Sequence, residues 1–174
     1  MERMPEFRLA RPTSLADAAA LLASATGARL VAGGTDLVPN LRRGIERPVL
    51  LVDLGAVGGM ADIVVAADGL VLGAGVRLAQ LASDARLAQA WPAVAEAARA
   101  VAGPGHRTVA TLGGNLCVDT RCVYYNQSEW WRQANGWCLK RNGDTCHVAP
   151  PSTRRAQATP ASGKSIEPRT RALR

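Results

Sequence analysis

The sequence predicts an α+β fold with α/β character, made of a small α/β unit over residues 1–55 and a second α+β unit over residues 56–116. Three observations support this prediction: strand-like and helix-like patterns alternate in the first unit, a hairpin signal opens the second, and an alanine-rich helical stretch follows it. The chain has 174 residues, of which 48% are hydrophobic and 20% charged, so it can bury a core.

The first helix is expected over residues 15–25. Thr13 or Ser14 can cap its start, because a hydroxyl oxygen accepts a hydrogen bond from the first turn of a helix, and Gly27 can end it. Residues 28–34, with the sequence ARLVAGG, are mostly apolar and finish in two glycines. This pattern predicts a short buried strand that turns sharply at its end.

A second, shorter helix is expected over residues 37–44, with Asp36 as its cap and Gly44 closing it. Residues 48–54, with the sequence PVLLVDL, form a second apolar run. We expect a strand here that is parallel to the first one, because a helix lies between the two.

The pattern changes in residues 61–76 from alternating strands and helices to two consecutive strand-like runs, which are separated by Asp68-Gly69. This dipeptide is typical of tight hairpin turns. Residues 78–102 then carry leucine and valine every three or four positions among alanines, which is typical of helices packed closely on a sheet. Pro92 is expected to open a fresh helix within this stretch, because proline suits the first helical turn.

The formal net charge of +7 is concentrated at the C-terminal end of the chain. Residues 1–149 carry 15 Lys and Arg against 13 Asp and Glu, whereas residues 150–174 carry six against one. This last stretch is rich in proline and has no apolar periodicity, so we expect a disordered, solvated basic tail and no nucleic-acid partner. No run approaches the roughly 18 apolar residues of a spanning helix. No secretory signal is visible either, which predicts a cytoplasmic protein without a membrane partner.

Two glycine-containing segments could hold a phosphate group. Residues 32–36 (AGGTD) follow the first predicted strand, and residues 111–115 (TLGGN) follow the helical stretch. Paired glycines allow close backbone approach, and successive N–H groups form an anion-binding concavity. Neither segment matches the dinucleotide fingerprint or the P-loop, and no lysine is placed to hold a γ-phosphate. Each could be an ordinary turn, but together they suit a clamp on a pyrophosphate.

Three stretches of this chain resemble the FAD-binding subunit of the molybdenum hydroxylases, the xanthine dehydrogenase and carbon monoxide dehydrogenase family. They are LVAGGTDLVPNLRRG, the Gly73-Ala74-Gly75 turn and GHRTVATLGGNLC. The resemblance implies a PCMH-type FAD-binding fold in which both glycine segments wrap the FAD pyrophosphate. The chain departs from the family pattern at His106-Arg107-Thr108, where many members have Ile-Arg-Asn. The resemblance assigns the cofactor contacts to Val31, Ala32, Gly33, Gly34, Thr35, Asp36, Thr111, Leu112, Gly113, Gly114 and Asn115.

An insertion over residues 117–149 follows the second glycine segment. It holds all four cysteines of the chain, in a C-x4-C-x15-C-x7-C pattern, and most of its aromatic residues, which we expect to pack around it. Clustered cysteines without an export signal indicate a metal or cluster site more readily than disulfides. His147 is expected to be an incidental polar residue rather than a ligand.

The stretches CVYYNQSEWWR and GWCLK…CHV of the insertion are similar to the β subunit of 4-hydroxybenzoyl-CoA reductases. This resemblance implies a [4Fe-4S] cluster bound by Cys122, Cys138 and Cys146, with a fourth cysteine further along, where this chain has Thr153-Arg154-Arg155 instead. Cys117 could replace it, or the site could be incomplete. The reading that we favour is that the gene is truncated or frameshifted near codon 150, so that the family's C-terminal domain is missing.

The resemblance implies a subunit that transfers electrons between a [4Fe-4S] cluster and FAD, with ferredoxin as donor. Its implied partners are a [2Fe-2S] subunit and a molybdenum-cofactor subunit that dehydroxylates 4-hydroxybenzoyl-CoA. No residue of this chain is expected to act as a general acid or base. Loss of the C-terminal domain is expected to weaken FAD binding. The alternatives are an inactive fragment, or a zinc-stabilised module with a basic tail in which all four cysteines form a tetrahedral site.

Overall fold

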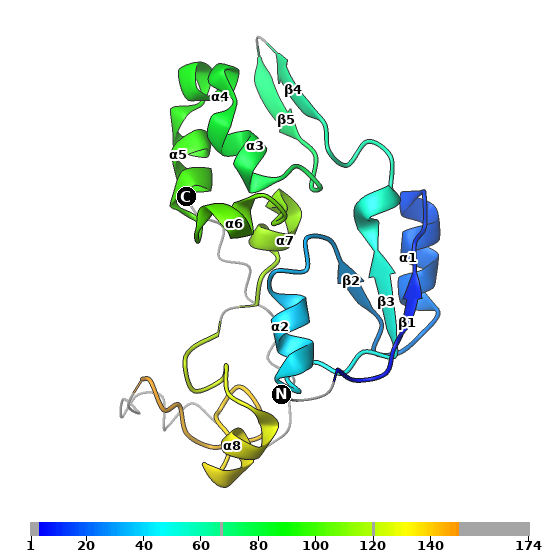
Figure 1. Ribbon diagram of the computed structural model, residues 1–174, viewed down its shortest axis with the longest axis vertical. Helices are drawn as coiled ribbons and strands as arrows, with labels where there is room; N and C mark the ends of the chain where they lie inside the picture. Colours follow the sequence, from blue (N-terminus) through cyan, green and yellow to red (C-terminus); the bar gives the residue numbers. More distant parts are fainter. Residues whose placement is uncertain (1–3, 67, 120, 150–174) are drawn as a thin grey trace. The chain divides into compact units, whose positions relative to one another are not determined.

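A computed structural model describes residues 4–66, 68–119 and 121–149 of the protein (Figure 1). The chain divides into two compact units, Met1–Val118 and Asp119–Arg174, which we name unit 1 and unit 2. The tail that the sequence predicts to be disordered, residues 150–174, lies outside the described residues. Within the described ranges, no helix is both long and apolar enough to span a bilayer.

Unit 1 begins with a three-stranded sheet in the order β1-β3-β2, made of β1 (Arg8–Ala10), β2 (Arg29–Val31) and β3 (Leu50–Asp53). Both pairings are parallel, which confirms the predicted relation between β2 and β3. Val52, at the centre of β3, is fully buried and packs with Leu50 and with residues of the first helix. The core of this sheet therefore lies on its middle strand.

One prediction for this sheet was wrong, and one of its strands was missed. β2 was expected to be buried, but it is an edge strand in which Arg29 is exposed and the Leu30 side chain is 45% exposed. β1 was not predicted at all, because three residues are too few to show a strand period, and the strand is defined by its pairing with β3.

The first helix, α1 (Leu15–Ala23), begins at the predicted place and ends two residues before the predicted end. Of the two predicted caps, Ser14 is the one used, since its hydroxyl oxygen accepts a hydrogen bond from the Asp17 backbone N–H at 3.1 Å. Gly27, with φ +85°, lies beyond the helix in the turn before β2. Its positive φ suits glycine, so it shapes the turn rather than the last helical residue.

The second helix, α2 (Leu37–Arg42), confirms the prediction, and Gly44 closes it with φ +64°. Asp36 occupies the cap position but makes no capping hydrogen bond with its side chain. Its backbone is in the αR region, whereas a capping residue normally has extended backbone that turns its side chain toward the first free N–H groups. The Asp36 carboxylate instead accepts a hydrogen bond from the Asn40 side-chain amide at 3.0 Å.

After a 3-10 turn, η1 (Leu54–Ala56), the chain forms the antiparallel hairpin β4 (Ile63–Ala66) and β5 (Gly69–Leu72), as predicted. Ala66 lies opposite Gly69, so that glycine is the first residue of β5. One face of the hairpin, including Ile63 and Leu72, packs on the helices that follow. The opposite face leaves valine side chains exposed.

The helical stretch consists of α3 (Leu78–Ser83), α4 (Ala85–Ala90) and α5 (Pro92–Ala100), which lie beside the hairpin in Figure 1. Pro92 opens α5 as predicted, whereas the break at Asp84 between α3 and α4 was not. These helices share one core, whose fully or almost fully buried members are Val76, Leu78, Leu81, Leu87, Ala95 and Ala98.

Asp84 joins α3 to α4, and its carboxylate accepts hydrogen bonds from the Arg86 and Leu87 backbone N–H groups. The side-chain hydrogen bond from Arg86 holds the pKa of the Asp84 carboxyl at about 2, below its ordinary value. Because this pKa is lowered on folding, the carboxylate stabilises the fold above about pH 4, and this contribution is lost as the pH falls toward 2.

We therefore expect wild type to be more stable than Asp84→Asn at pH 5, with the difference shrinking between pH 4 and pH 2. Urea unfolding of both proteins across this pH range would measure the effect. A difference that stays constant through the acid range would contradict it.

Two short helices, α6 (Pro104–Arg107) and α7 (Leu112–Leu116), complete unit 1. The predicted TLGGN loop is therefore mostly helical, because Thr111 caps α7 and both glycines lie inside it. The described part of unit 2 contains one helix, α8 (Glu129–Ala134), capped by Ser128.

Candidate functional site

The first glycine segment connects β2 to α2, and its two glycines are needed for different reasons. Gly33 lies directly against the backbone of residues 109 and 110: a Cβ built on it would collide with the Val109 carbonyl oxygen and lie 2.7 Å from the carbonyl carbon. Gly34 has φ +69°, which strains any residue with a side chain. The sequence suggested close approach to a ligand, but the close approach at Gly33 is to another segment of unit 1.

The backbone N–H groups of Gly34 and Thr35 donate to no protein acceptor within the described residues. Two successive N–H groups without a protein acceptor suit an anionic oxygen. The adjoining carboxylate of Asp36 is held by Asn40, which is only 2% exposed. The segment therefore offers donors for a phosphate, and a fixed acceptor one residue further on.

The second glycine segment is used differently. The backbone N–H of Leu112 donates to the Val76 carbonyl at 2.8 Å, and that of Gly113 donates to the Ala74 carbonyl at 2.7 Å. The N–H of Gly114 donates to the Thr111 hydroxyl oxygen at 3.2 Å. Because these three N–H groups already have acceptors in the protein, the Asn115 side chain is the polar group of this segment best suited to a ligand.

The three motifs that carry the family resemblance meet within unit 1. Gly33 places the first segment against the residues just before Thr111, and a Cβ on Gly113 would lie 2.8 Å from the Ala74 Cβ, in the Gly73-Ala74-Gly75 turn. The sequence did not predict that Val109 packs against Gly33, or that Ala74 packs against Gly113, so closely that only glycine fits. No local pattern marks these residues, because their role comes from contacts between segments far apart in the chain.

Thr111 is 9% exposed, and its hydroxyl is the cap that starts α7. We expect Thr111→Ala to lower the free energy of unfolding by about 1 kcal/mol, because the Gly114 N–H loses its acceptor. Thr111→Ser keeps the oxygen and should retain most of that stability. Urea unfolding of the three proteins would test this, and equal loss in both variants would show that the methyl group matters rather than the cap.

The cysteines of unit 2 are not gathered into a metal site within the described residues. In the described ranges, no group of three or more His, Cys, Asp or Glu side chains is placed to hold a metal ion. Cys117 is exposed at the end of α7 in unit 1, whereas Cys122, Cys138 and Cys146 are half-buried in unit 2. The three cysteines of unit 2 therefore do not form a preformed metal or cluster site within the described residues.

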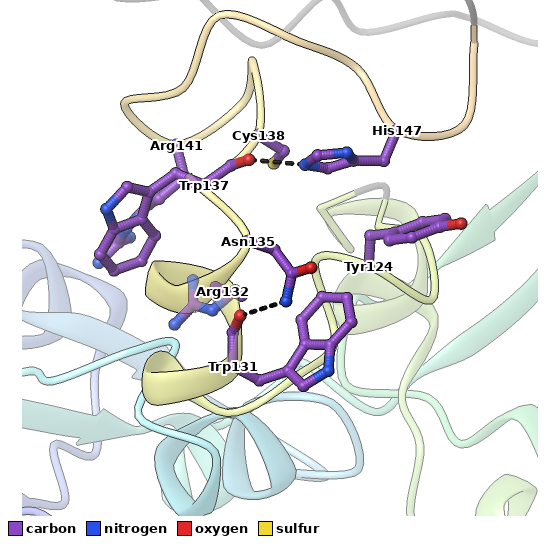
Figure 2. Close-up of a pocket in the computed structure, with 8 residues that line it drawn as sticks. All are labelled: Tyr124, Trp131, Arg132, Asn135, Trp137, Cys138, Arg141 and His147. Carbon is purple, nitrogen blue, oxygen red and sulfur yellow. Dashed lines mark hydrogen bonds between the residues drawn. The ribbon is translucent and has the colours of Figure 1, made fainter.

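Unit 2 has a small pocket, lined by Tyr124, Trp131, Arg132, Asn135, Trp137, Cys138, Arg141 and His147 (Figure 2). The His147 Nε2 atom lies 2.7 Å from the Trp137 carbonyl oxygen, and its ring stacks on Tyr124 with the centroids 5.3 Å apart. His147 was expected to be incidental, but it bridges two parts of this unit.

Comparisons with known proteins agree with the motifs. Residues 5–152 match the family described as the FAD binding domain in molybdopterin dehydrogenase. The xanthine dehydrogenase FAD-binding subunit of Escherichia coli O157:H7 is 40% identical over 108 residues, which cover 62% of this chain and 37% of that protein. The aldehyde oxidoreductase FAD-binding subunit PaoB of Escherichia coli strain K12 is 35% identical over 122 residues, covering 70% of this chain and 38% of that protein.

Among solved structures, carbon monoxide dehydrogenase from Hydrogenophaga pseudoflava matches with a TM-score of 0.63 and 30% identity, covering 66% of this chain and 40% of that one. The chain belongs to the family of FAD-binding domains found in molybdopterin dehydrogenases, and its fold is the predicted PCMH-type fold. It spans 37% to 38% of the length of the two curated relatives described. These matches confirm the molybdenum hydroxylase resemblance and do not single out 4-hydroxybenzoyl-CoA reductase.

Proposed function

We propose that unit 1 binds FAD and that the protein is the FAD-binding, electron-transferring part of a molybdenum-containing oxidoreductase. The observation that carries this proposal is the packing of Gly33 against the backbone of Val109, just before Thr111. It places the two glycine segments next to each other, as a clamp on one pyrophosphate requires. The N–H groups of Gly34 and Thr35, which lack a protein acceptor among the described residues, support it.

In this proposal the contacts come from Val31 to Asp36 and from Thr111 to Asn115. The N–H groups of Gly34 and Thr35 donate to a phosphate oxygen, and the Thr35 hydroxyl adds a third donor. The hydrogen bond from Asn40 fixes the Asp36 carboxylate, and therefore limits its approach to the phosphate. When bound, FAD supplies reversible electron storage, and the share of this chain is to position it and tune its potential.

The proposed partners are a subunit with the molybdenum cofactor and one with a [2Fe-2S] cluster, with ferredoxin as electron donor. Support for partners comes from relatives that are themselves subunits, such as the nicotine 6-hydroxylase medium subunit of Paenarthrobacter nicotinovorans. The finer assignment, to 4-hydroxybenzoyl-CoA reductase with a [4Fe-4S] cluster on Cys122, Cys138, Cys146 and Cys117, depends on the insertion alone. Since the described residues hold no group of three or more His, Cys, Asp or Glu side chains placed for a metal ion, no electron-transfer step of the proposed function passes through a cluster.

Flavin binding by the full chain is the direct test. Purified protein titrated with FAD is expected to quench the flavin fluorescence in a saturable way, and Thr35→Ala is expected to weaken the affinity several-fold through loss of one donor to a charged group. Thr26→Ala, an exposed threonine in the turn before β2, is the matched control and should bind like wild type.

Two outcomes would contradict the proposal. One is a folded chain that shows no saturable FAD binding, which would favour an inactive fragment. The other is an equal loss of affinity in Thr35→Ala and Thr26→Ala, which would mean that the first glycine segment does not contact the cofactor.

A further inference from the structure

The cysteines of the insertion do not converge on a metal site, yet the segment is well packed. Structural zinc and cluster segments normally obtain their folding free energy from the metal, and they unfold without it. In the described part of unit 2, the side chains that meet at the centre are aromatic and cationic instead. We propose that the described part of unit 2 folds without any metal ion or iron–sulfur cluster, around the guanidinium of Arg132 held between Tyr125 and Trp137.

Arg132 is 3% exposed, although it is a charged residue on a short helix. Its guanidinium carbon lies 5.5 Å from the ring centroid of Tyr125 and 5.5 Å from that of Trp137. Aromatic faces attract a guanidinium through their negative π surfaces, and this attraction grows when water is excluded. Tyr125, itself 5% exposed, is thus one wall of a cation site that belongs to the protein.

A second cation completes this arrangement. The Lys140 ammonium lies 5.3 Å from the centroid of the same Tyr125 ring, and it pairs with the Asp119 carboxylate at 2.6 Å. We call this arrangement of Tyr125, Trp137, Arg132 and Lys140 the stack. It connects the start of the unit, helix α8 and the loop after it. These are the segments that carry or flank Cys122 and Cys138, so the stack takes the place that a shared metal would have in tying them together.

The backbone around Cys138 is held independently of any metal. Trp137 has φ +62°, an unfavourable conformation for a residue with a side chain, and such a residue persists only where its surroundings determine it. Its N–H donates to the Arg132 carbonyl at 2.8 Å, and its carbonyl is contacted by His147 at 2.7 Å. Gly143 packs against the Cys138 backbone nitrogen so closely that a Cβ would lie 2.7 Å from it.

The electrostatics of Arg132 fit a buried cation held by rings and nearby acidic groups. Burial lowers the pKa of its guanidinium, and the neighbouring Arg141 acts in the same direction, whereas Tyr125, Glu129 and Cys138 oppose the shift. An arginine remains protonated throughout the accessible pH range, so the charge is permanent and the two rings help to accommodate it.

The test uses the full chain, because unit 2 has not been shown to fold alone. The protein is purified anaerobically, its iron, acid-labile sulfide and zinc are measured, and the metals are then removed with EDTA and bipyridyl. Three of the four tryptophans lie in unit 2, so near-ultraviolet circular dichroism, with limited proteolysis, reports mainly on its packing. Arg132→Met is compared with Gln133→Met, which changes the exposed next residue of the same helix.

Metal-free wild type and Gln133→Met are expected to keep the tryptophan signal and the protease resistance, whereas Arg132→Met is expected to lose both. Loss of the signal from wild type on chelation would overturn the proposal in favour of a cluster or zinc fold, and so would an ordered, metal-free Arg132→Met. If Arg132→Met cannot be obtained, chelation of wild type still shows whether unit 2 needs a metal to stay folded. FAD titration of the same samples reports on unit 1, so failure of the proposed function would be seen separately.

Discussion

Gly33→Ala is expected to abolish FAD binding and to destabilise unit 1. The new Cβ would collide with the Val109 carbonyl oxygen and lie 2.7 Å from its carbonyl carbon, and no flexible side chain is there to move aside. Overpacking costs about 1–3 kcal/mol, and a backbone obstacle places this change at the upper end. The first glycine segment would also be pushed away from the second, which separates the two halves of the proposed pyrophosphate clamp.

The measurements are the urea midpoint and the FAD titration, made on the same preparation. Gly58→Ala is the matched control, since Gly58 is exposed and a Cβ there would meet nothing within 4 Å. It should be close to wild type in both assays. A Gly33→Ala protein with wild-type stability and flavin affinity would show that the two glycine segments do not approach as described.

Leu87→Ala is expected to have the largest purely structural effect. Leu87 is fully buried in the core shared by α3, α4 and α5, where it packs with Leu81 and Ala95. Removing a buried leucine side chain to the β-carbon costs about 2–5 kcal/mol, because transfer energy is lost and a cavity remains. This is a large fraction of the roughly 5–15 kcal/mol that stabilises a typical domain.

Urea unfolding monitored by far-ultraviolet circular dichroism would measure the change in unfolding free energy. Val71→Ala is a suitable comparison, since that side chain is 67% exposed on the outer face of the hairpin and should change stability by no more than about 0.5 kcal/mol. Similar effects of both substitutions would mean that α4 does not contribute Leu87 to the core.

The two units differ in how well the sequence predicted their functional sites. In unit 1, the motifs around Gly33 and Thr111 predicted a family, and the comparisons confirmed it. In unit 2, the resemblance of the insertion implied a cluster, but the described residues hold no group of three or more potential ligands placed for a metal, and the charged residue buried there is Arg132. Cysteine spacing lists potential ligands, whereas their convergence depends on how the chain between them packs.

The sequence by itself determined the elements that depend on interactions between residues close together in the chain. A hydroxyl cap at Thr13 or Ser14 before α1, Pro92 at the start of α5 and the hairpin β4–β5 were all predictable, because caps, proline and tight turns act over a few residues. Only the tertiary structure decided the rest. β2 is an edge strand because β1 joins the other side of β3, and Gly33 is needed because Val109 lies against it. Both depend on partners far along the chain, and no local pattern records such partners.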